Sequence, residues 1–325
     1  MRLLSGCASR ADGRTLSAFR RARLSSAVLL FALCSVARAQ GEAGRVSVAV
    51  LDMGTTATAA RASEHVVKLL AESSAGLRLA LLDRGMARAA ARGAAYAGSL
   101  NMTLAEARSL GASIGCDFYV TGDAQTIRRS STARPVYFES YASIFVVSSR
   151  TGRLVLWDRP AAESETAERA ESALLASLDS RAGQRYASAL SAAFEREERE
   201  RFDTPDAEEH GAVIDLSNDE GADALKDLRE PAPYRRLRPA YTDAAFKAEA
   251  EATVDASVEI DSGGEVREVS IVRWAGFGLD EEVASTVRRM HFRPAEREGE
   301  PVAVRVLLRY NFRRPAKTER AVKEK

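Results

Sequence analysis

The stretch GFGLDEEVASTVRRMHFRPA, residues 276–295, decides the fold of the C-terminal part of this chain. Gly278 marks a break between the preceding strand pattern and a helix. The acidic residues after it suit the first turn of that helix, where negative charge complements the helix dipole. Val283, Val287 and Met290 then recur at helical spacing, which predicts one buried stripe. The stretch therefore predicts a short helix that lies against other elements of a small domain.

Strand patterns stand on both sides of this helix. Residues 252–260 and 266–272 are two strand-like runs around the glycine turn at 261–265. After the helix, a polar turn at 298–301 leads into VAVRVLLRYNF, residues 302–312, in which apolar and polar residues largely alternate. The predicted order of elements is strand, strand, helix, strand.

Several short motifs in this order resemble the C-terminal domain of the TonB family. They are Gly-Leu-Asp before the helix, Phe-x-Pro-Ala after it, Gly-x-Pro-Val before the last strand and a terminal Phe. The resemblance extends over residues 233–313, although Tyr241-Thr242 stands where the family usually has Tyr-Pro. It implies a periplasmic domain that pairs its last strand with an extended segment of an outer-membrane receptor and passes on energy from an inner-membrane motor.

The resemblance also implies where a partner binds. An unpaired strand edge offers backbone donors and acceptors to an extended peptide, and side chains along it select the partner. We expect Tyr241, Arg305, Leu307, Arg309 and Tyr310 to form this partner-binding site. Two alternatives remain: these residues only complete a small sheet, or a second copy of the chain covers the edge in a homodimer.

The preceding part of the chain predicts an α/β domain over residues 45–196. The fold class is therefore α+β, with an N-terminal α/β domain of two or three layers around a mixed sheet and a C-terminal ββαβ domain. LLDR (81–84) and ARSLGASIGCDFYVTG (107–122) resemble the N-terminal domain of TolB and CsgG-like envelope proteins. The strands are expected at 45–52, 77–83, 116–121, 136–148 and 154–158, and the helices at 58–71, 103–110 and within 161–201.

The first residues, 1–39, have the pattern of a signal peptide. An arginine-rich start is followed by a short apolar run, Leu24–Ala37, and by Ala37-Arg38-Ala39, which suits signal peptidase. We expect cleavage between Ala39 and Gln40, and hence a periplasmic protein. One alternative is lipoprotein processing at Cys34, and another is a retained inner-membrane anchor facing the periplasm, although the run is shorter than the roughly 20 residues that span a bilayer.

Composition limits the partners and the sources of stability. Cleavage would remove seven arginines and one aspartate and take the formal charge from +1 to about −5, which argues against a nucleic-acid partner. It would also leave Cys116 as the only cysteine, so that no internal disulfide can form. The acidic, proline-punctuated segment 197–232 predicts a linker, and residues 314–325 form a basic tail.

The sequence does not predict an enzyme, a cofactor or a metal site. Its three histidines, His65, His210 and His291, are far apart, and it has no glycine-rich phosphate loop and no paired metal-ligand motif. Aspartates near strand ends could converge in a cleft of the α/β domain, but capping of loops and helices is the commoner role of such residues. They are Asp52, Asp83 and Asp117.

These observations predict a periplasmic cell-envelope protein that binds an extended peptide or receptor segment by strand addition, within or outside a larger envelope complex. The first alternative is a membrane-anchored energy transducer for outer-membrane transport. The lack of a long anchor and of a proline-rich spacer argues against it. The second alternative is a hydrolase that uses the cleft of the N-terminal domain.

Overall fold

The computed structural model describes residues 45–73, 79–131, 134–202, 213–217 and 227–314. The elements below belong to one compact unit, Val46–Lys325. The elements of the N-terminal part are β1 (Val46–Val50), α2 (Ala57–Ser73), β2 (Leu79–Leu81), α3 (Arg84–Gly93), α4 (Leu104–Ile114), β3 (Phe118–Arg129), β4 (Tyr137–Ser148), β5 (Leu154–Asp158), β6 (Ala161–Ser164), α5 (Ala167–Ser177) and α6 (Ser180–Phe202).

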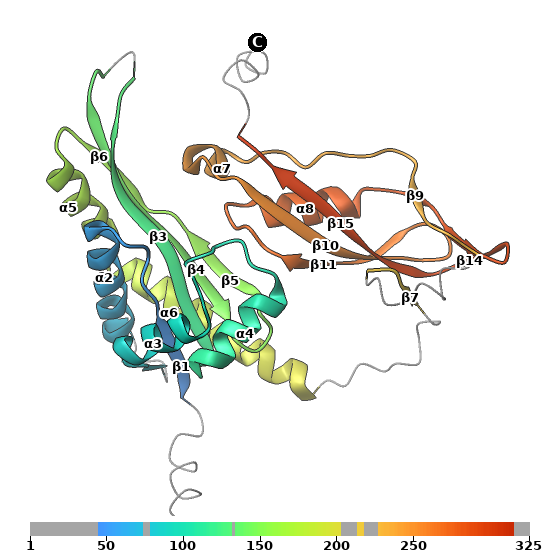
Figure 1. The fold of residues 1–325 in the computed structure, drawn as a ribbon, viewed down its shortest axis with the longest axis horizontal. Helices are drawn as coiled ribbons and strands as arrows, with labels where there is room; N and C mark the ends of the chain where they lie inside the picture. Colours follow the sequence, from blue (N-terminus) through green and yellow to red (C-terminus); the bar gives the residue numbers. More distant parts are fainter. Residues whose placement is uncertain (1–44, 74–78, 132–133, 203–212, 218–226, 315–325) are drawn as a thin grey trace, which may run out of the picture. The chain divides into compact units, whose positions relative to one another are not determined.

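The N-terminal part is built on a mixed sheet with the strand order β2-β1-β3-β4-β5, in which β6 pairs with the far end of β4 (Figure 1). β1 is parallel to both β2 and β3, whereas β3, β4 and β5 are antiparallel. The parallel strands β1 and β2 need a crossover connection along one face of the sheet, and α2 supplies it. The predicted mixed sheet is therefore confirmed.

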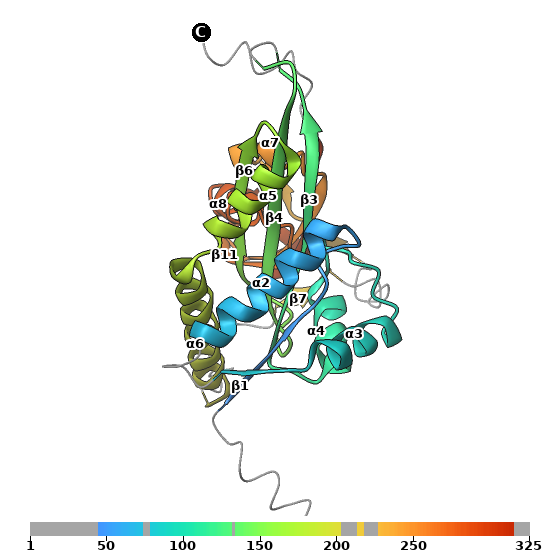
Figure 2. The ribbon, with the colours of Figure 1, turned by 90° about the vertical axis from the view of Figure 1, so that its left-hand side faces the viewer.

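Helices cover both faces of this sheet. One core joins β1, β3 and β4 to the apolar stripes of α2, α5 and α6, and Figure 2 shows α2 and α5 in front of β3 and β4. A second core joins the opposite face to α3 and α4, and it includes Trp274 from the C-terminal part. The N-terminal part is therefore a three-layer arrangement, and a distant residue completes its second core.

Several elements of the N-terminal part differ from the expectation; β3, for example, was expected at residues 116–121 and extends over Phe118–Arg129. α4 begins with a capping box of Thr103 and Glu106, and it continues past the expected end at residue 110 to Ile114, with Gly115 as its C-cap. Gly111 lies inside α4, and glycine is required there because a Cβ would meet Ser149 of the β4–β5 turn at 2.4 Å. Residues 161–164, expected in a helix, form β6, and α3 was not expected at all.

The C-terminal part contains a second main sheet of four strands and two small sheets of two and three strands. Its elements are β7 (Ile214–Asp215), β8 (Leu228–Arg229), β9 (Ala232–Pro233), α7 (Asp243–Ala248), β10 (Ala252–Ile260), β11 (Val266–Arg273), α8 (Leu279–Arg288), β12 (Phe292–Arg293), β13 (Ala295–Arg297), β14 (Glu300–Val302) and β15 (Val304–Phe312). The main sheet has the order β11-β10-β15-β7, and α8 packs on β10 and β11 (Figure 1). The predicted ββαβ order is confirmed, and the fold class is α+β.

The expected linker contains ordered pieces. β7 pairs with β15, β8 pairs with β13, and β9 pairs with β12. Ile214 and Leu216 also pack against the C-terminal core. This short apolar run is surrounded by acidic residues in the sequence, and its order comes from the sheet that it joins.

The ends of the chain are not part of this description. The predicted signal peptide, the cleavage residues Ala39 and Gln40, and the basic tail after Arg314 lie outside the described residues. Within the described ranges, no helix has the length and apolar character needed to cross a membrane.

Candidate functional site: the edge of the last strand

The free edge of β15 is defined by the direction of its backbone groups. The carbonyl of Arg305 accepts a hydrogen bond from the amide of Leu216, 2.8 Å away, so that it points away from β10 and toward β7. Alternate residues of a strand direct their amides and carbonyls to the same side. Leu307, Arg309 and Asn311 therefore point their backbone groups to the side of β7, and no described residue pairs with that edge beyond Arg305.

An independent contact confirms this assignment. The same alternation requires Thr253 of β10, opposite Asn311, to direct its amide and carbonyl away from β15. The side chain of Asn101 occupies both groups from that other side, with distances of 3.0 Å to the amide and 2.8 Å to the carbonyl. The open amides and carbonyls of β15 thus belong to its odd-numbered residues.

Charged side chains line the outer face of β15 beside this edge. Arg309 makes two hydrogen bonds to Asp255, at 2.7 and 3.0 Å, and Arg305 contacts Glu259 at 3.1 Å. Burial of Asp255 raises its pKa, but hydrogen bonds from Arg309 and Arg273 outweigh burial and hold the pKa below its ordinary value. Both arginines keep exposed surface, 58% of the side chain for Arg309, so that they can also meet an approaching acidic group.

The five predicted partner-binding residues divide between the two faces of the sheet. Arg305, Leu307 and Arg309 lie on the outer face, with Leu307 39% exposed. Tyr241 and Tyr310 lie on the core side instead: the Tyr241 hydroxyl donates to the Ala250 carbonyl at 2.8 Å, and the Tyr310 hydroxyl lies 3.7 Å from the sulfur of Met290. The structure therefore does not bring all five together.

Asn311 is an edge residue that the sequence analysis missed. Its backbone faces the open edge, and its side-chain oxygen accepts a hydrogen bond from the hydroxyl of Thr253 at 2.8 Å. The alternation of residues 302–312 contained the signal, because Asn311 falls on the same face as Leu307 and Arg309.

A joint between the two sheets forms a second candidate site. Trp274, which follows β11, is 2% exposed, stacks on Phe145 with ring centroids 5.8 Å apart, and donates its indole N–H to the carbonyl of Gly152 at 3.0 Å. Asn101 also donates to the carbonyl of Trp274 at 2.7 Å. These contacts join segments that are far apart in the sequence.

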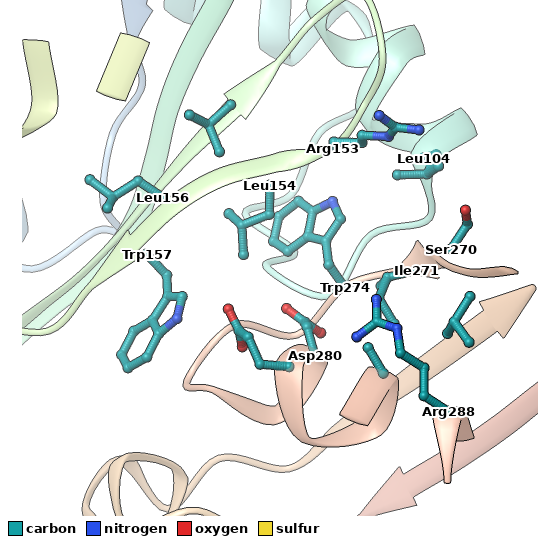
Figure 3. A pocket seen from close by; sticks show the side chains of 14 residues that line it. Leu104, Arg153, Leu154, Leu156, Trp157, Ser270, Ile271, Trp274, Asp280 and Arg288 are labelled. Atoms are coloured by element: carbon teal, nitrogen blue, oxygen red, sulfur yellow. The ribbon is translucent and has the colours of Figure 1, made fainter. Parts of the chain in front are cut away.

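A pocket of about 530 Å³ lies beside this joint, between the edge strand β5, the edge strand β11 and α8. Figure 3 shows Trp157, Trp274, Asp280 and Arg288 around it. Its lining combines apolar side chains with separate charged groups, and it holds no histidine or cysteine.

Asp280 is the most perturbed carboxyl group of this pocket. Burial raises its pKa to about 6, although it accepts hydrogen bonds from the amides of Ala275 and Gly276, each at 2.8 Å, which act in the opposite direction. Both oxygens are thus committed to the turn before α8. A general acid or base needs a reacting group within hydrogen-bond reach, and the geometry assigns this carboxyl to holding the turn.

The other candidate catalytic residues have structural partners. Asp52 pairs with Arg84 and Arg88, Asp83 caps α3 by accepting from the amide of Met86, and Asp117 accepts from the amide and hydroxyl of Ser47. Asp83 therefore has the expected capping role, whereas Asp52 forms ion pairs with two arginines and Asp117 bonds to a residue of β1.

The described histidines, His65 and His291, and Cys116 form no constellation either. His65 contacts the carbonyl of Leu178 at 2.8 Å, His291 pairs with Glu265 at 2.9 Å, and His210 lies outside the described residues. Burial raises the pKa of the Cys116 thiol, which disfavours the reactive thiolate. Among the residues that the structure describes, no group of three or more His, Cys, Asp or Glu could hold a metal ion.

Comparison with known proteins gives one family match. Residues 238–313 match the model described as the C-terminal domain of Gram-negative bacterial TonB proteins. No curated protein sequence matches the chain significantly.

Solved structures with similar parts include the C-terminal domain of TonB from Pseudomonas aeruginosa, with 19% identity, 33% of this chain and 99% of that chain covered, and a TM-score of 0.25. The C-terminal domain of LpoB from Salmonella enterica has 14% identity, coverage of 36% and 82%, and a TM-score of 0.26. The lipoprotein GNA1162 from Neisseria meningitidis has 12% identity, coverage of 44% and 99%, and a TM-score of 0.29.

Proposed function

Since residues 238–313 form a TonB C-terminal domain, we propose that this chain is a TonB-like protein of the cell envelope that binds an extended segment of a partner protein by strand addition to β15. The partner is a peptide segment of another envelope protein, of which an outer-membrane receptor is one example. The protein acts in the periplasm after export, and it binds without catalysing a reaction.

One observation carries this proposal. The backbone groups of Leu307, Arg309 and Asn311 face an edge with which no described residue pairs, while the even-numbered residues hold β15 to β10. Each added backbone hydrogen bond contributes about 0.5–1.5 kcal/mol, so that a strand must form several of them and bury side chains to bind stably. Leu307 offers an apolar contact in the middle of this edge, and Arg309 next to it favours an acidic residue.

Leu307 also allows a sharp test. Its amide points to the open edge. Proline at this position therefore removes a hydrogen-bond donor that a partner strand would use, and it leaves the hydrogen bonds between β15 and β10 in place. Peptides selected from a random phage-displayed library against the wild-type protein would then be titrated against Leu307→Pro and against Leu307→Ala, which keeps the amide.

We expect Leu307→Pro to weaken binding about tenfold or more and Leu307→Ala to weaken it less, because only the first removes a backbone donor. Circular dichroism and thermal unfolding would verify that both variants stay folded. Equal affinity of the wild type and a folded Leu307→Pro would refute strand addition at this edge.

The energy-transducing alternative differs in the fate of residues 1–39, which lie outside the described residues. Sequencing the N-terminus of the protein from its native host separates the two. A start at Gln40 in the soluble fraction would support a free periplasmic binding protein, and an intact N-terminus in the inner membrane would support a transducer.

A further inference from the structure

The edge of β15 is already occupied at one end by the same chain. β7, residues Ile214–Asp215, lies parallel to β15 in the register Val304–Ile214 and Arg305–Asp215. The amide of Ile214 donates to the carbonyl of Ala303 at 3.0 Å, and the amide of Leu216 donates to the carbonyl of Arg305 at 2.8 Å. A segment from the expected linker thus performs strand addition within the protein.

The side chains of this segment follow the two faces of the sheet. Ile214 and Leu216 pack at the border of the C-terminal core, while Asp215 lies on the outer side with a carboxylate oxygen 3.9 Å from Arg305. The hydroxyl and amide of Ser217 both donate to Asp215 and, together with Arg305, lower its pKa below the ordinary value, although burial opposes this. The segment therefore presents an apolar, an acidic and an apolar residue in succession.

The attachment of β7 is limited. Its pairing extends over two residue pairs, and both the Arg305 and the Asp215 side chains are 41% exposed, so that their 3.9 Å contact is screened by water. A pairing of two residues and two half-buried apolar side chains make a weak contact, which remains closed because the segment is tethered to the same chain, at an effective concentration of the order of millimolar.

We propose that β7 is an internal occupant of the binding edge, which a longer partner strand displaces, and that the edge at Val304–Arg305 accepts a parallel strand with the pattern apolar, acidic, apolar. This inference rests on the proposed function. An edge accepts one strand at a time, so that a partner that extends from Asn311 to Val304 has to take the place of β7. The site at Leu307–Asn311 is open, and the site at Val304–Arg305 is self-inhibited.

The test uses a synthetic peptide with the chain's own residues 211–218, GAVIDLSN. The peptide is titrated into the full protein, and binding is followed by nuclear magnetic resonance as shifts of the protein's amide signals. Leu216→Pro removes the amide that donates to Arg305 and releases β7. Val213→Pro is the matched control, because the amide of Val213 donates to no described residue. A peptide with Asp215 replaced by Lys tests the acidic position.

We expect the peptide to bind Leu216→Pro about tenfold or more tightly than the wild type or Val213→Pro, and the Lys peptide to lose most of that gain. Equal affinity for the wild type and Leu216→Pro, or no binding to either, would overturn the proposal. A peptide selected from the library gives a separate reading. If Leu307→Pro weakens the binding of this peptide but Leu216→Pro leaves it unchanged, strand addition is supported and displacement of β7 is refuted. If neither substitution changes the binding, strand addition is refuted, and the titration with GAVIDLSN still tests the role of β7.

Discussion

Replacement of Trp274 by alanine should weaken the whole unit, because this side chain completes the second core of the N-terminal sheet. Trp274 is 2% exposed, stacks on Phe145 and satisfies the carbonyl of Gly152. Removal of a buried tryptophan costs about 3–5 kcal/mol, since it leaves a cavity and, here, an acceptor without its donor. This is a large part of the typical free energy of unfolding of about 5–15 kcal/mol.

The assay is urea unfolding followed by far-ultraviolet circular dichroism, because the substitution also removes one of the two tryptophans. With a denaturant slope of about 3 kcal/mol/M, the midpoint should fall by roughly 1 M or more. Trp274→Phe keeps an aromatic ring against Phe145 and loses the hydrogen bond, so that we expect an intermediate loss of about 1–3 kcal/mol.

Tyr234→Ala is the control, because Tyr234 is 74% exposed and its removal should change the free energy of unfolding by less than about 0.5 kcal/mol. A loss below about 1 kcal/mol for Trp274→Ala, similar to that of a surface substitution, would refute the conclusion that this residue joins the two sheets in one core.

Three further substitutions test single contacts. Burial raises the pKa of Asp280 from 3.8 to about 6, so the folded protein holds this proton more tightly than the unfolded chain, and the free energy of unfolding of the wild type should fall as the pH rises from 3.8 to about 6. Asp280→Asn should remove this contribution in urea unfolding measured across the same pH range. An unchanged dependence of the free energy of unfolding on pH in Asp280→Asn would contradict this expectation. Asn101→Ala should lose about 1–3 kcal/mol, since it leaves the amide and carbonyl of Thr253 unpaired, and a neutral result would contradict the joint. Thr103→Ala should lose about 1 kcal/mol, and Thr103→Ser should keep most of it, if the capping box with Glu106 stabilises α4.

The C-terminal elements could be predicted because local patterns determine them. Glycines mark the breaks before β11 and α8, acidic residues begin α8, and alternation runs along β15. α3 could not be found in this way, because its buried residues are only Ala87 and Ala91, which leave no large apolar stripe. A helix of alanine and arginine has helical propensity but no pattern that distinguishes its buried face.

The contacts that organise the candidate sites are not local. Asn101 lies just before α4, and its partner Thr253 is 152 residues away. Trp274 fills a core whose other members come from the N-terminal part. β7 is surrounded by acidic residues, and its order depends on an edge that residues 303–305 provide. Sequence patterns report the face that an element buries, and they do not report which distant element covers it.

Residue-resolved amide hydrogen exchange along β15, with and without a peptide selected for binding, tests strand addition most directly. In the free protein, the amides of Leu307, Arg309 and Asn311 should exchange about tenfold or more faster than those of Leu308 and Tyr310, which face β10. Peptide binding should slow the first three and leave the other two unchanged. Fast exchange of Leu307, Arg309 and Asn311 that persists in the saturated complex would show that the peptide binds elsewhere and would contradict the proposed function.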